Sequence, residues 1–216
     1  MTKIYRMTAI FTLVGTKKTG TISTQRIVRF GQAAMAVGVL FVLGSIGDEL
    51  KSKLFWLGMF FVGVGFGLLA SQLGNVNMSS VDESESAEVG GLQGVFQNLG
   101  LSLGTALVGS VFILSLTSGF TAAVQASPDL STDAKNTIIQ QAESGVGIVS
   151  KDQADQYVID NGGSESTAQA VSSLYQESQL ESLRIGMFFV FACLLGSFAL
   201  SSQLPSSLLK SKKQTK

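Results

Sequence analysis

Four long apolar stretches alternate with shorter polar segments along the chain. They lie at about residues 31–47, 54–74, 89–118 and 184–204. A helix of about 20 residues, rising about 1.5 Å per residue, crosses the roughly 30 Å hydrocarbon core of a bilayer. The pattern therefore predicts an all-α, polytopic membrane protein, with three transmembrane helices within residues 31–118 and a fourth near the C-terminus.

The third stretch, Val89–Ser118, carries no charge and has two chemically different faces. Helical periodicity places six small or amide residues on one face: Gly90, Gln93, Gly94, Gln97, Gly100 and Gly104. Six large apolar residues share the other face: Leu92, Phe96, Leu99, Leu103, Leu107 and Leu114. The large face suits lipid. The small face suits either close packing against another helix or the wall of a substrate path.

A second stripe of small residues runs along the stretch 54–74. Its members are spaced four, three and four residues apart: Gly63, Gly67, Ala70 and Gly74. Small residues at this spacing let two membrane helices approach closely. We expect this stripe to pack against the small face of the third helix.

Residues 119–183 form an acidic segment between the third and fourth apolar stretches. It has nine acidic and two basic residues, a net charge of −7. Pro128 is expected to stop the preceding helix, Ser131 or Asp133 to cap a short helix, and Ser150 with Gln153 to form a capping box. A turn is expected at 161–163, and the helix after Ser164 can run into the fourth stretch. The segment is predicted to be a small helical cap on the membrane surface.

Basic residues are concentrated at the two ends of the chain. Residues 1–30 hold six Lys and Arg residues and the tail 205–216 holds four, together ten of the fifteen in the chain. An even number of spans puts both ends on one side, and the positive-inside rule makes that side the cytoplasm. The 119–183 cap is then expected outside the cell.

The chain lacks the chemistry of most enzymes and of metal or nucleotide sites. It has no His, a single Cys193 within an apolar stretch, and no net charge. No cofactor, metal or nucleic acid is expected as a ligand, and no enzymatic activity. Between the span boundaries the polar side chains are amides and hydroxyls. Gln93, Gln97 and Asn98 are the candidates for a substrate path, although most such amides are expected to bond between helices.

Three segments resemble the C-terminal part of major facilitator superfamily transporters, in the bacterial 14-helix drug:proton antiporter branch. They are Ser71–Asn77, Gly90–Gly94 and Leu99–Gly109, the last with the LGxxxGxAxxG-like pattern of the penultimate helix. The segment Gly145–Gln153 resembles the long outside loop of actinobacterial members. The resemblance implies the last four of 14 helices, a bacterial plasma membrane location, and multidrug efflux by alternating access. It also implies that Gly109 joins the packing glycines.

The resemblance covers about residues 26–205 and leaves the family's acidic first helix, basic loop motif and fifth-helix motif without a counterpart. We therefore expect an incomplete transporter, from a truncated or split gene, that is inactive alone. Its expected partners are the lipid bilayer, the missing N-terminal helices and, in a whole transporter, small amphipathic substrates. The alternative is a stand-alone four-helix structural or interaction subunit, for which the expected partners are further copies of the chain in a homo-oligomer. A small four-helix exporter would need an intramembrane Glu, which is absent.

Overall fold

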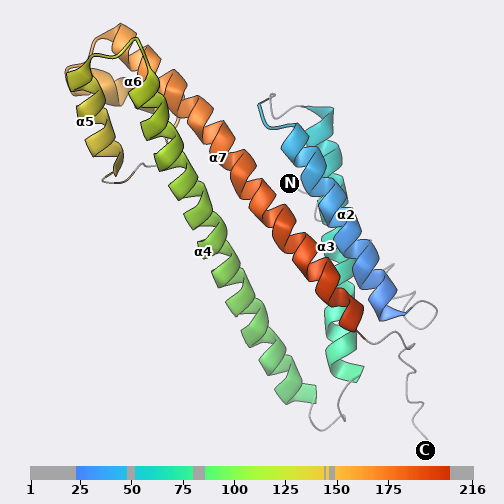
Figure 1. The fold of residues 1–216 in the computed structure, drawn as a ribbon. Coiled ribbons are helices and arrows are strands. Elements are labelled where there is room, and N and C mark those ends of the chain that lie inside the picture. The colour runs from blue at the N-terminus through green and yellow to red at the C-terminus, as the bar shows by residue number, and fades with distance from the viewer. Residues whose placement is uncertain (1–22, 48–51, 80–85, 144, 146–148, 205–216) are drawn as a thin grey trace, which may run out of the picture. The chain divides into compact units, whose positions relative to one another are not determined.

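The computed structural model describes residues 23–47, 52–79, 86–143, 145 and 149–204, and they are helical with short connections (Figure 1). The helices are α2 (Thr24–Gly44), α3 (Lys53–Ser79), α4 (Ser86–Ala126), α5 (Thr132–Glu143), α6 (Lys151–Asp160), α7 (Glu165–Leu200) and the short 3-10 helix η2 (Ser201–Gln203). Four of them (α2, α3, α4 and α7) are long and apolar enough to cross a membrane. The predicted all-α, polytopic fold is confirmed.

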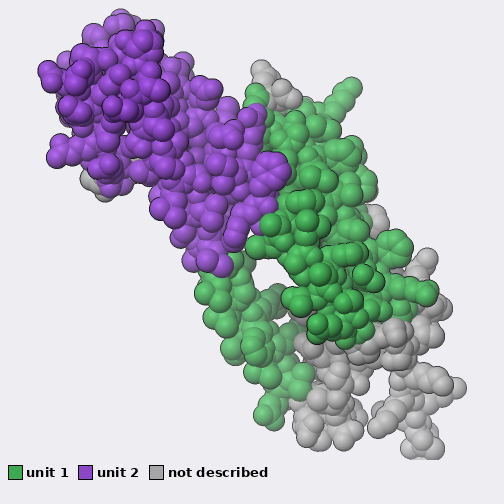
Figure 2. Space-filling model, in the orientation of Figure 1, with its two compact units in different colours: residues 1–104, 190–216 green, residues 105–189 purple. Residues whose placement is uncertain are grey.

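The chain divides into two compact units, which are coloured in Figure 2. Unit 1 comprises residues 1–104 and 190–216, and unit 2 comprises residues 105–189. The helices α4 and α7 each contribute one part to each unit. Unit 1 therefore holds α2, α3 and the apolar ends of the two long helices, whereas unit 2 holds α5, α6 and the other ends.

In unit 1, α2 and α3 pack against each other through pairs of glycines. A Cβ atom built on Gly31 would lie 3.0 Å from the backbone oxygen of Gly65, and one on Gly38 would lie 2.7 Å from that of Gly58. Each helix spaces its two glycines seven residues apart, which is about two turns. The order reverses between the helices, so the pair is antiparallel and the two backbones touch.

The first helix begins earlier than predicted. It starts at Thr24 rather than near residue 31, so Arg26 and Arg29 belong to α2 and not to a preceding segment. Where the membrane-spanning part of this helix begins stays a prediction. Ile27 is 6% exposed, and this burial on the packed side of α2 favours continuing the helix back through these polar positions.

Polar contacts tie α2 to the C-terminal end of α7 and to η2, all within unit 1. The Gln32 amide donates to Ser197 Oγ at 2.8 Å, and the Gln25 amide donates to the backbone oxygen of Ser202 at 2.9 Å. The Arg29 guanidinium carbon lies 4.8 Å from the Phe198 ring centre. The expected inter-helix use of membrane amides is confirmed for Gln32.

The connection between α3 and α4 is shorter than the sequence predicts. The predicted spans 54–74 and 89–118 leave residues 75–88 between them, but α3 continues to Ser79 and α4 begins at Ser86. Three of the loop carboxylates, those of Asp82, Glu83 and Glu85, lie outside the described residues. Glu88 lies in the first turn of α4, where a negative charge interacts favourably with the helix dipole.

Both long helices exceed the thickness of a bilayer. The 41 residues of α4 extend about 60 Å and the 36 residues of α7 about 54 Å, whereas the hydrocarbon core is roughly 30 Å thick. The polar half of α7 runs without a break into its apolar half, as predicted. The two helices therefore carry the cap on their polar ends.

The cap has its own hydrophobic core within unit 2. The buried members come from α4, α5, α7 and the α4–α5 connection: Leu116, Phe120, Val124, Leu130, Ala142, Val171 and Tyr175. Ser131 accepts from the Ala134 amide, Ser164 accepts from the Thr167 amide, and Ser150 with Gln153 forms the predicted capping box. The turn before α7 is also present, with Gly162 at a φ of 84° that favours glycine.

Candidate functional site

The predicted substrate-path residues lie on the N-terminal half of α4, in unit 1. Gln93 and Gln97 are one helical turn apart, and Asn98 follows on the neighbouring side of the helix. Gln93 is half-buried, whereas Gln97 and Asn98 are exposed. The structure puts all three amides on one helix, α4. Their role in a substrate path stays a prediction.

The glycines of α4 leave an open surface within the described part of the chain. A Cβ atom built on Gly94, Gly100, Gly104 or Gly109 would meet no atom of another element within 4 Å. The six large residues of the opposite face, from Leu92 to Leu114, are all at least half exposed. The helix thus presents a small polar face and a large apolar face, with space for further helices along the former.

The predicted stripe of small residues on α3 is not the surface through which α3 contacts α2. Gly67 is buried and Gly63 is half-buried. The glycines of α3 that touch α2 are Gly58 and Gly65, which the prediction did not name. Their seven-residue spacing matches that of Gly31 and Gly38, and this match between two helices is the signal that could have found them. Packing of the Gly63–Gly67 stripe against α4 stays a prediction.

Two buried polar atoms of α2 have no hydrogen-bond partner among the described residues. They are Nε of Arg29 and Oε1 of Gln32, both on α2. Gln32 is 6% exposed, and its amide nitrogen is already engaged by Ser197. Leaving such groups unsatisfied in an apolar setting costs about 1–3 kcal/mol each. This part of α2 therefore suits a further polar contact.

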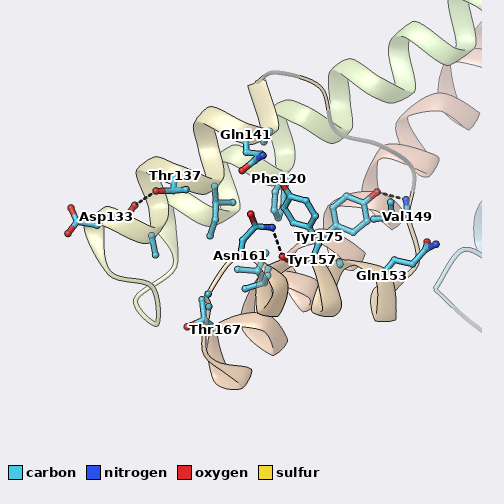
Figure 3. A pocket seen from close by; sticks show the side chains of 18 of the residues that line it. Phe120, Asp133, Thr137, Gln141, Val149, Gln153, Tyr157, Asn161, Thr167 and Tyr175 are labelled. Atoms are coloured by element: carbon cyan, nitrogen blue, oxygen red, sulfur yellow. Dashed lines mark hydrogen bonds between the residues drawn. The ribbon is translucent and has the colours of Figure 1, made fainter.

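The cap encloses a cavity of about 590 Å³, which the sequence analysis did not foresee (Figure 3). It lies entirely within unit 2 and opens between α5, α6 and α7. The lining residues come from these helices, their connections and the end of α4: Phe120, Asp133, Ala134, Thr137, Ile138, Gln141, Ala142, Gly145, Val149, Gln153, Ala154, Tyr157, Val158, Asn161, Gly162, Gly163, Thr167, Val171 and Tyr175. Its volume is typical of a small-molecule site, which spans about 300–1,000 Å³.

Aromatic rings and a few fixed polar groups shape this cavity. The Phe120 and Tyr175 rings meet edge to face, with centres 5.6 Å apart and planes at 85°. The Val149 amide donates to Tyr175 Oη at 3.2 Å, and the Asn161 amide donates to the Tyr157 backbone oxygen at 2.8 Å. These two bonds are drawn in Figure 3 and hold the connection before α6 and the turn after it around the cavity.

Gly163 closes the turn between α6 and α7. Its backbone amide donates to the Val158 oxygen at 2.9 Å, and a Cβ atom at this position would lie 2.9 Å from the same oxygen. A larger residue would therefore push the turn away from α6. The predicted turn at 161–163 thus brings the start of α7 beside the cavity-lining residues of α6.

Comparison with known proteins gives one informative similarity. Over 123 residues, or 54% of its length, the chain is 30% identical to a probable actinorhodin transporter of Streptomyces coelicolor. The aligned region is 21% of that protein, so the chain spans about a fifth of the length of the relative that it matches. No protein-family model matches the chain, and no solved structure matches it.

The similarity points away from an enzyme and toward transport. The relative is described as a transporter, and this chain has four helices that are long and apolar enough to span a membrane. Together they support a multi-pass membrane protein of transporter type.

Proposed function

We propose that this chain is the C-terminal membrane part of a proton-coupled, multidrug-type exporter of the major facilitator superfamily, in its 14-helix branch. In the proposed arrangement it lies in a bacterial plasma membrane, with both termini in the cytoplasm and the cap outside. The observation that carries the proposal is the 30% identity to a probable actinorhodin transporter. The resemblance of Leu99–Gly109 to the penultimate helix of that branch supports the finer assignment.

The open face of α4 is the proposed contact with the rest of the transporter. Gly94, Gly100 and Gly104 leave room for a backbone at close range, since an added Cβ meets nothing there among the described residues. Gln93, Gln97 and Asn98 share or border this face and can hydrogen-bond to a substrate. The large face, from Leu92 to Leu114, would remain in lipid.

Proton coupling has to come from other helices. The stretches 54–74, 89–118 and 185–204 contain no Asp, Glu, Lys, Arg or His. A group that binds and releases a proton inside the membrane must be ionisable, and amides do not titrate at ordinary pH. Export by this chain alone is therefore not expected.

The test is complementation in a bacterial strain that lacks its own major efflux pumps. This chain is expressed with the S. coelicolor relative from which the matching region has been removed, and efflux of a fluorescent organic cation is measured. Export is expected only when both parts are present. The variants Gln93→Leu and Gln97→Leu should reduce the efflux rate about tenfold, since each removes a hydrogen-bonding group worth about 1–1.5 kcal/mol.

Val95→Leu is the matched control, because it places the same side chain on the opposite side of α4. It should leave efflux unchanged. Export by this chain alone would contradict the incomplete-transporter proposal. A monodisperse oligomer that never restores export with the relative would instead favour the stand-alone membrane subunit.

A further inference from the structure

The cavity in the cap has the features of a ligand site of its own. It is formed wholly by residues 120–175 of unit 2, so it needs no other helix of the chain to complete it. It combines apolar walls with a small number of held polar groups, which is the usual composition of a small-molecule site. The following inference does not depend on the proposed transport function.

We propose that the cap cavity binds a planar aromatic cation. The first reason is shape: the Phe120 and Tyr175 rings are 6% and 4% exposed and stand edge to face at the cavity wall. The two rings pack on each other in the cap core and give one wall of the cavity an apolar, aromatic character. Aromatic faces also attract cations.

The second reason is charge. Asp133 is the one charged residue among the described residues that line the cavity, and its carboxylate points away from the cavity (Figure 3). The whole cap, residues 119–183, carries nine acidic and two basic residues. A negative field of this kind concentrates cations and repels anions near the surface, within about 10 Å at 0.1 M salt. An aromatic anion of the same size should therefore be excluded.

The third reason is that the cavity wall is held open by specific bonds. Tyr175 Oη accepts from the Val149 amide, and Gln153 Oε1 accepts from the Ser150 amide in the capping box. The first bond joins the connection before α6 to α7, and the second closes the first turn of α6. A ligand that binds to an already ordered wall loses less conformational entropy than a ligand that must order the wall itself.

Binding is tested with the full chain in lipid nanodiscs, using empty nanodiscs to subtract partition into lipid. The probes are ethidium, as a planar aromatic cation, and anthracene-2-carboxylate, as an aromatic anion, each measured by equilibrium dialysis. Saturable, one-to-one binding of ethidium is expected, with at least tenfold weaker binding of the anion. Equal binding of the two probes, or ethidium uptake no greater than that of empty nanodiscs, would overturn the proposal.

Two pairs of variants on α5 locate the site. Thr137 lines the cavity and is exposed at its rim, whereas its exposed neighbour Asn136 does not line it. Thr137→Trp should fill the cavity and weaken ethidium binding at least tenfold, while Asn136→Trp should not. Both positions are exposed, so neither change requires the core to repack.

The second pair separates local charge from net charge. Thr137→Lys and Asn136→Lys add the same charge to the cap, but only the first puts it at the cavity. Thr137→Lys should weaken ethidium binding several-fold more than Asn136→Lys and should lessen the discrimination against the anion. Equal effects of the two lysines, together with equal effects of the two tryptophans, would mean that ethidium binds elsewhere.

Discussion

At the residue scale, the close contacts of this protein depend on glycines that face each other across two helices. The sequence analysis chose glycines that form stripes on a single helix, such as Gly63 and Gly67. The structure instead places Gly38 against Gly58 and Gly31 against Gly65. A stripe on one helix indicates which side is small, but it does not identify the partner, because the partner and its register are tertiary properties.

Gly38→Ala is therefore expected to destabilise the α2–α3 pair. The new methyl group would lie 2.7 Å from both Gly58 O and Val62 N, and backbone atoms cannot move aside as a flexible side chain can. Overpacking of this kind costs about 1–3 kcal/mol. The measurement is SDS-induced unfolding of the purified chain in mixed micelles.

Gly196→Ala in α7 is the matched control. A Cβ atom there meets nothing within 4 Å among the described residues, so the change should be neutral or slightly stabilising through helix propensity. If both variants unfold at the wild-type detergent fraction, the glycine contact between α2 and α3 does not limit the stability of the pair.

At the element scale, the local signals in the cap predict its helices well. Ser131, Ser150 and Ser164 each cap a helix as expected. These signals work because a cap satisfies backbone amides within three residues and needs no distant partner. The boundaries of α2 and α4 are less predictable, since polar residues at a membrane helix end can lie inside or beyond the helix.

Ser150→Ala should loosen α6 and the cavity wall that depends on it. The variant loses the bond from the Gln153 amide to Ser150 Oγ, which is 3.3 Å long, and such caps are worth about 1 kcal/mol. Amide hydrogen exchange in the first turn of α6 is expected to rise about fivefold. Ser173→Ala, at an exposed position within α7, should leave exchange in α6 unchanged; an equal rise in both variants would show a general effect on the cap.

At the scale of the whole molecule, the proposed orientation rests on charge. Ten of the fifteen basic residues belong to the N-terminal and C-terminal regions, which the positive-inside rule assigns to the cytoplasm. The acidic cap would then face outward. Labelling from outside the cell tests this orientation directly.

Cysteine labelling provides that measurement. Because Cys193 is the only cysteine, a Cys193→Ser background allows single cysteines at Ser166 in the cap and at Thr215 in the tail. A membrane-impermeant maleimide should label Ser166→Cys in intact cells and Thr215→Cys only after permeabilisation. The opposite result would invert the proposed topology, and labelling of both in intact cells would mean that α7 does not cross the membrane.

The sequence by itself determined the elements: four apolar spans, the acidic cap, its serine caps and the turn before α7. These follow from hydrophobic length and from bonds between residues close in the chain, which need no knowledge of the fold. Only the tertiary structure decided which glycines meet, that Gln32 bonds to Ser197, and that the cap encloses a cavity beside Phe120 and Tyr175. Each of these joins residues far apart in the chain, and their meeting depends on helix register and packing rather than on any local pattern.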